Sequence, residues 1–256
     1  MNVCLNCGTE FTGKFCFNCG QKIVERKDRT LFNFLAHFFN EFFSWDSKFW
    51  SSFKPLLFKP GFLSEKYFSG SVASYISPLK LYLCVSLVVF LVASRVDNDV
   101  LGSLIEDDSV FKGVIMDKIN KKGVSSEVFN EQFTSEIYDK MPIYTLLMVF
   151  FFSLPLNLIF INRRKLFVEH LVFSLHFYSF VLLCAVAGSL LELTGIELNL
   201  LFIFVIPLFY LYFAVKRTYQ FNYGVTFLFT LFLSGVFIFL WFVWFFAAFF
   251  ITLWTV

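Results

Sequence analysis

Four cysteines near the start of the chain have the spacing of a metal site. Cys4 and Cys7 form one pair and Cys16 and Cys19 a second, which gives the pattern C-x2-C-x8-C-x2-C. Two residues between cysteines let one tight turn present both sulfurs to a single ion, and four thiolates suit tetrahedral Zn²⁺. A glycine follows each pair, so each turn can close with backbone amides near the sulfurs. The pattern predicts a structural Zn²⁺ site, because four thiolates leave no coordination position for a substrate.

Iron and a redox-active cysteine pair remain alternatives at these positions. A disulfide is disfavoured if the head of the chain lies in the cytoplasm, where thiols stay reduced. The other two cysteines, Cys84 and Cys184, lie inside apolar runs and are expected to be small buried side chains. About twenty residues cannot form a core unaided, so metal binding is expected to supply the folding energy of a zinc ribbon over residues 1–22.

The composition is that of an integral membrane protein. Hydrophobic residues make up 58% of the 256 positions and charged residues 16%, against about 45–50% and 25% in soluble proteins. A soluble fold of this length could not bury all 41 phenylalanines. No charged segment followed at once by an apolar one, the pattern of a secretory signal, opens the sequence. We therefore expect the N-terminal residues to stay in the compartment where they are made.

Five apolar runs approach the roughly 20 residues that a bilayer-spanning helix needs. They are Ile76–Ser94, Pro142–Ile161, Leu166–Leu191, Leu198–Val215 and Val225–Val256. Lys80 intrudes near the start of the first run and is expected to extend to the interface. The last run has no charged residue and is long enough to tilt strongly, or to break near Gly235 into a hairpin. The predicted fold is an all-α membrane protein with about five transmembrane helices, or six with that hairpin, over residues 76–256.

The segment over residues 28–75 is predicted to be an amphipathic region at the membrane interface. Its apolar side chains recur three and four residues apart, which is the helical period, at Leu31, Leu35, Phe38, Phe42, Trp45, Phe49 and Phe53. The segment is too polar to cross a bilayer, and its aromatic side chains suit the headgroup boundary. The alternative is a helix packed on the flank of the membrane domain. Pro55, Pro60 and Gly61 are expected to end this helix.

Charges between the apolar runs predict the orientation. Basic residues precede the first run and follow the second and fourth, at Lys48, Lys54, Lys59, Lys66, Lys80, Arg163, Arg164, Lys165, Lys216 and Arg217. The segment from Arg95 to Lys140 has ten acidic and six basic residues, and the segment around Glu192 and Glu197 has no base. This alternation places the N-terminus in the cytoplasm and, with five spans, the C-terminus outside.

The first outer segment, residues 95–141, is expected to be an extracytoplasmic helical loop. Val128, Phe133, Ile137 and Met141 recur at helical spacing within it. The alternative is a solvated connector without a packed face.

Three polar residues near the start of the third apolar run form a second candidate site. Glu169 and His176 lie seven positions apart, hence on one helix face, and His170 points about 100° away. Ionisable groups at membrane depth are expensive and are often functional. Glu169, His170 and His176 could form hydrogen bonds between helices that fix their packing. A proton or ion relay and a metal site are the alternatives. A hydrolytic site with Ser174 or Ser179 lacks the usual nucleophile motif, so no catalytic residue is assigned.

The chain resembles a family of uncharacterised bacterial membrane proteins that is common in the Bacteroidetes. The resemblance rests on the CxNCG…FCxNCGQ head, the block LLFKPGFLSEKYFSGSVASYISPLKLY over residues 56–82, and EHLVFSLHFYSF over residues 169–180. The family pattern in the second block reads RPG…Y..GKR..Y..P. Here Lys59 replaces the arginine, and Ser71 with Val72 replaces the Lys-Arg pair. The resemblance implies a bacterial inner-membrane protein and brings no activity with it.

We expect a non-enzymatic protein whose zinc ribbon mediates protein interaction or assembly at the cytoplasmic face of the bilayer. A transporter that uses Glu169, His170 and His176 as a proton or ion relay is one alternative, and a lipid-modifying enzyme is another. Nucleic acid is not an expected partner, because only Lys14 and Lys22 lie in or beside the head.

Overall fold

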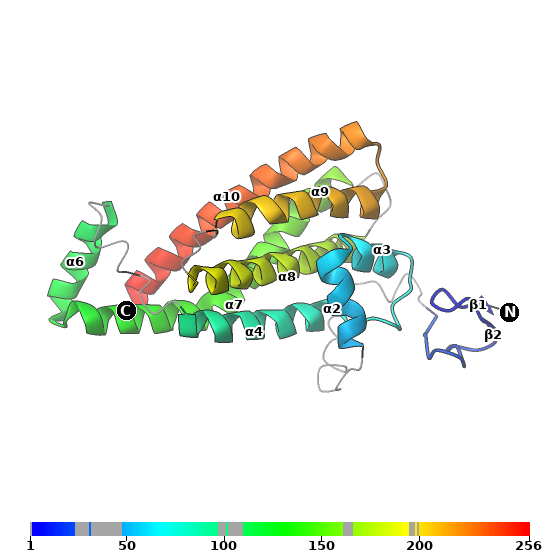
Figure 1. Cartoon of the computed structure of the whole chain (residues 1–256), viewed down its shortest axis with the longest axis horizontal. Coiled ribbons are helices and arrows are strands. Elements are labelled where there is room, and N and C mark those ends of the chain that lie inside the picture. Colours follow the sequence, from blue (N-terminus) through cyan, green and yellow to red (C-terminus); the bar gives the residue numbers. More distant parts are fainter. Residues whose placement is uncertain are drawn as a thin grey trace.

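The protein consists of a small N-terminal head and a bundle of long helices (Figure 1). A computed structural model describes residues 2–23, 48–96, 110–160, 166–194 and 200–256, with the single positions 31, 101 and 198. The head, residues 2–23, contains the antiparallel strands β1 (Asn2–Val3) and β2 (Glu10–Phe11). Figure 1 places the head and the chain's C-terminus at opposite ends of the long axis.

Helices of very different length make up the bundle. They are α2 (Phe49–Phe58), α3 (Phe62–Phe68), α4 (Pro78–Val96), α6 (Val110–Lys122), α7 (Ser126–Ile159), α8 (Phe167–Glu192), the π-helical turn η3 (Leu201–Val205), α9 (Ile206–Tyr219) and α10 (Tyr223–Thr255). The central helix is α8, which is buried along most of its length and contacts α3, α4, α7 and α9. Apolar side chains on every side of α8 produce this position, because a helix that is hydrophobic all round is buried.

Four helical segments are long and apolar enough to cross a membrane: Ser126–Ile159, Phe167–Glu192, Leu201–Tyr219 and Tyr223–Thr255. The first predicted span corresponds to α4, whose apolar stretch over Pro78–Val92 is shorter. Large apolar side chains of α10 point away from the protein, at Phe227, Leu228, Leu231, Phe232, Phe239, Phe242, Phe246, Phe250 and Trp254. An exposed apolar surface of this extent suits contact with lipid tails. The chain is therefore a multi-pass membrane protein.

The alternative of a hairpin near Gly235 is wrong, because α10 is one continuous helix from Tyr223 to Thr255. No described atom lies within 4 Å of a Cβ added at Gly235, so within the described part of the chain this glycine is not needed for a close contact. Away from water, a helix break leaves unpaired backbone groups, and a glycine alone does not compensate for that loss.

The helix that contains the second predicted span begins much earlier than Pro142. Helix α7 starts at Ser126, whose preceding residue Ser125 accepts a hydrogen bond from the Val128 amide, and it continues through Pro142. Tertiary packing overrides the proline, because Phe129, Phe133 and Ile137 are buried against α6 and the end of α10. The predicted stripe is correct at Phe133 and Ile137, whereas Val128 is exposed and Phe129 takes its place.

Helix α2 also continues past a residue that was expected to end it. It runs from Phe49 through Pro55 to Phe58, and the chain turns at Lys59, Pro60 and Gly61 into α3. Leu56 and Leu63 are buried, so the α2–α3 pair packs into the bundle against α8 and α9. Most of the predicted interfacial stripe, from Leu35 to Trp45, lies outside the described residues.

Candidate metal centre and buried polar pairs

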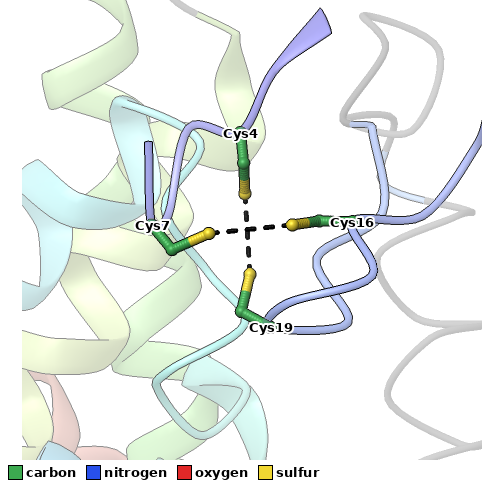
Figure 2. A group of neighbouring side chains, drawn as sticks. All are labelled: Cys4, Cys7, Cys16 and Cys19. Atoms are coloured by element: carbon green, nitrogen blue, oxygen red, sulfur yellow. Dashed lines mark hydrogen bonds between the residues drawn. The ribbon is translucent and has the colours of Figure 1, made fainter. Parts of the chain in front are cut away.

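The four cysteines of the head point their sulfurs at one common centre (Figure 2). The Sγ atoms of Cys4 and Cys19 are 3.5 Å apart and those of Cys7 and Cys16 are 3.7 Å apart. All four sulfurs lie within 4.8 Å of one another, and all four cysteines are free thiols. Sulfurs about 2.3 Å from a tetrahedral ion lie about 3.8 Å apart. The group could therefore hold a metal ion through four thiolates.

Each cysteine pair sits in a turn with the same backbone hydrogen bonds. In the first turn the Gly8 amide donates to the Cys4 carbonyl at 2.9 Å, and the Cys4 amide donates to Thr9 at 3.0 Å. In the second turn Gly20 donates to Cys16 and Cys16 donates to Gln21, each at 2.9 Å.

The glycines are required because both adopt a left-handed backbone, with φ of 76° at Gly8 and 71° at Gly20. The two C-x2-C pairs of the sequence thus form two turns of the same backbone conformation, and the two turns face each other.

Local hydrogen bonds favour the thiolate form of one cysteine in the head. The Cys7 Sγ lies 3.3 Å from the Thr9 hydroxyl. Hydrogen bonds from the Thr9 side chain and from its backbone amide stabilise the thiolate and lower the pKa of Cys7 from 9.0 to about 6. Cys7 is therefore largely a thiolate at neutral pH, and the thiolate is the form that binds metals.

The head has a very small core. Cys4, Phe11 and Cys16 are its buried hydrophobic side chains, with Cys19 and Ile23 packed against them. Leu5, Phe15 and Phe17 are instead exposed, by 59%, 61% and 81%. A core of this size supplies little folding free energy, so cross-linking by a metal would be a major contribution to the stability of the head.

The head contacts the loop between α3 and α4. The Asn6 side chain hydrogen bonds with the hydroxyls of Ser71, at 2.8 Å, and Ser74, at 3.0 Å. The side-chain oxygen of Gln21, Oε1, accepts the backbone amides of Val72, at 3.2 Å, and Ala73, at 2.8 Å. These partners lie 51 to 68 positions away from the head residues that bind them. No local pattern in a sequence indicates such a contact.

The predicted polar residues of α8 are all buried, and their contacts go to different elements. The Glu169 carboxylate accepts the Leu166 amide at 3.0 Å, at the start of α8 itself. The His170 Nδ1 lies 2.9 Å from the Tyr219 hydroxyl at the end of α9. The His176 Nδ1 lies 2.9 Å from the Ser64 hydroxyl of α3. Within the described ranges, the cysteine quartet is the only group of at least three metal-ligating side chains.

Ser64 and Tyr219 were not predicted as partners of the α8 histidines. Ser64 is 1% exposed and lies 112 positions before His176 in the sequence. The ring of Phe160 stacks on Tyr219, with centroids 4.0 Å apart, and on His170 at 5.9 Å. Each hydrogen bond joins α8 to another element, which is a common way for polar side chains to stabilise helix packing in a membrane.

Side chains of α9 hold the α2–α3 pair through two backbone carbonyls and one carboxylate. The Tyr210 hydroxyl donates to the Leu56 carbonyl at 2.9 Å, and the Thr218 hydroxyl donates to the Gly61 carbonyl at 3.3 Å. The Arg217 Nε donates to the Glu65 carboxylate at 2.6 Å. The turn at Gly61 thus fits closely against α9.

Comparison with known proteins gives one family match. Residues 46–90 match the family described as a protein of unknown function, DUF3667. The match covers the α2–α3 pair, the α3–α4 loop and most of α4, and it does not include the head. No curated protein and no solved structure matches the chain.

Proposed function

We propose that this multi-pass protein lies in the bacterial inner membrane with its head in the cytoplasm. The head binds one structural Zn²⁺ and mediates protein interaction or assembly, and the chain catalyses no reaction. The observation that carries this proposal is the convergence of the four thiols on one centre. Two of the sulfur–sulfur distances, 3.5 Å and 3.7 Å, are close to the distance of about 3.8 Å between two thiolates on one tetrahedral ion. Four thiolates fill the coordination sphere of Zn²⁺, which suits a structural ion rather than a catalytic one.

The distribution of charge supports the cytoplasmic position of the head. Lys59, Lys66, Lys216 and Arg217 lie on α3, α9 and the α2–α3 turn, at the end of the bundle that faces the head (Figure 1). At the opposite end the lysines of α6 are accompanied by acidic residues at Asp117, Glu127, Glu131, Glu136 and Asp139. An excess of basic residues marks the cytoplasmic side of a membrane protein.

Exposed apolar side chains on the head support a role in protein interaction. Leu5 and Phe17 occupy the same position in the two cysteine turns, directly after the first cysteine of each pair. Both are largely exposed, by 59% and 81%, and are therefore accessible to a partner. Aromatic residues at the centre of a contact are frequent carriers of binding energy.

The experiment compares the proteins that copurify with the wild-type chain and with a Cys16→Ser, Cys19→Ser variant. Coexpression of two differently tagged copies shows whether a neighbouring copy is the partner. We expect the double variant to lose its zinc and its partners, and Phe17→Ser to lose partners while it keeps zinc. Phe58→Ser is the matched control, because Phe58 is 79% exposed and lies outside the head. Identical partner sets in all four proteins would exclude the interaction role.

A further inference from the structure

The face of the head that carries Asn6 and Gln21 is a binding surface for the α3–α4 loop. The Asn6 side chain contacts two serine hydroxyls of the loop. The Gln21 side chain accepts two consecutive backbone amides from Val72 and Ala73. Gln21 is 4% exposed, and its amide nitrogen donates to the Lys22 carbonyl at 2.9 Å, so its orientation is fixed from both sides.

The positions of both loop-binding residues depend on the cysteine turns. Asn6 lies between Cys4 and Cys7, inside the first turn. Gln21 follows the second turn, and its backbone carbonyl accepts the Cys16 amide. If a metal ion joins the two turns, it also fixes the distance between Asn6 and Gln21. Without the ion, the two turns are joined by the small core of Cys4, Phe11 and Cys16 and by the Asn18–Thr9 hydrogen bond, which contribute little folding free energy.

The α3–α4 loop connects this surface to the membrane domain. Its residues Ser71 to Ser74 follow α3, and α4 begins at Pro78. The Ile76 amide donates to the Ser52 hydroxyl of α2 at 2.9 Å, so the same loop also contacts the α2–α3 pair. A change in the head can therefore reach three helices of the bundle through one short segment.

We propose that the head is a metal-dependent clamp on the α3–α4 loop of its own chain. With the ion bound, Asn6 and Gln21 hold the loop, and loss of the ion releases it. This inference rests on the proposed metal binding and goes beyond it, because it names the surface that the metal organises and the segment that this surface binds. The partner-binding side chains Leu5 and Phe17 remain exposed while the loop is held.

The second cysteine turn provides a matched control. Asn18 has the same position in its turn as Asn6. Each asparagine directly precedes the second cysteine of its pair, and a glycine follows that cysteine. The Asn18 side chain donates to the Thr9 hydroxyl at 3.1 Å, within the head. Asn6→Ala and Asn18→Ala therefore make the same chemical change, and only the first removes a contact with the loop.

The test is amide hydrogen exchange of the full-length protein in lipid nanodiscs, with zinc and after treatment with a chelator. Peptides that contain residues 70–77 report on the loop. The Val72 and Ala73 amides donate to Gln21, whereas Gly70 and Ser71 donate to Tyr67 and Lys66 within the α3 segment. We expect the chelator and the Gln21→Ala variant each to speed exchange at Val72 and Ala73 about tenfold, the effect of losing one hydrogen bond of ordinary strength. Asn6→Ala should also speed loop exchange, and Asn18→Ala should leave it unchanged.

Bound zinc is measured by elemental analysis in the same samples. Gln21→Ala should keep its zinc and still show faster loop exchange, which separates the loop contact from metal binding. If the wild-type chain binds zinc and the chelator leaves loop exchange unchanged, the clamp is refuted and the proposed metal site stands. If the wild-type chain binds no zinc, the metal site and the clamp both fail. Equal effects of Asn6→Ala and Asn18→Ala would also refute the clamp.

Discussion

Replacing Gly61 with alanine should destabilise the protein through a clash with α9. An added Cβ would lie 2.7 Å from the Ala214 carbonyl oxygen, 2.9 Å from the Ala214 Cα and 2.9 Å from the Thr218 hydroxyl. The two nearest Ala214 atoms belong to the backbone, so rotation of a side chain cannot relieve the clash. Gly61 also has a left-handed backbone, with φ of 73°.

The expected cost has two parts. A left-handed conformation costs a non-glycine residue about 1–2 kcal/mol, and overpacking of a close contact costs about 1–3 kcal/mol. The free energy of unfolding should therefore fall by roughly 2–5 kcal/mol in Gly61→Ala. The α2–α3 pair should lose its packing on α9 before the rest of the bundle unfolds, because the Gly61 carbonyl also accepts the Thr218 hydroxyl of α9.

The assay is reversible unfolding of the purified protein in mixed micelles, followed by tryptophan fluorescence and circular dichroism. Gly123→Ala is the control, because Gly123 has a similar φ of 68° and nothing lies within 4 Å of its added Cβ. This control should show only the backbone part, about 1–2 kcal/mol. If Gly61→Ala costs no more than Gly123→Ala, the close approach of the α2–α3 turn to α9 is wrong.

Three further predictions concern single polar groups. Ser64→Ala should lower the free energy of unfolding by about 1–3 kcal/mol, because it leaves the buried His176 Nδ1 without this partner, whereas the exposed Ser69→Ala should change it by less than about 0.5 kcal/mol. Tyr210→Phe should cost about 1–3 kcal/mol through the Leu56 carbonyl, and a neutral result would contradict that contact. In metal-free protein whose first cysteine turn stays folded, alkylation of Cys7 should have its midpoint near pH 6, since the lowered pKa favours the thiolate above that pH. Thr9→Val should move this midpoint upward toward 9.0, and an unchanged midpoint would exclude the role of Thr9.

Local sequence patterns predicted the elements whose signal is contained in a few neighbouring residues. The two cysteine pairs produce two tight turns because spacing and glycine placement suffice for such a turn. Apolar runs located α8, α9 and α10, since a helix in lipid must consist of apolar residues over its whole crossing. The membrane class and the helical fold therefore followed from composition and hydropathy.

Contacts between distant segments could not be predicted from these patterns. The Ser64–His176 pair, the Asn6 contact with the α3–α4 loop and the fit of Gly61 against α9 each join positions far apart in the sequence. The continuity of α7 across Pro142 was not predicted for a related reason. Packing of Phe129 and Phe133 keeps α7 helical across it, and that packing depends on α6 and α10. The helix propensity of single residues is a weak guide where tertiary contacts decide whether a helix continues.

The most direct test of the metal site is the zinc content of the purified full-length protein, determined by elemental analysis against protein concentration. Cys84→Ser with Cys184→Ser is the control, since these two cysteines lie on α4 and α8, away from the head. We predict one Zn²⁺ per chain in the wild type and in this control, and none in Cys16→Ser, Cys19→Ser. Equal zinc in all three proteins, or no zinc in a wild-type chain with its four head thiols reduced, would contradict the four-thiolate site.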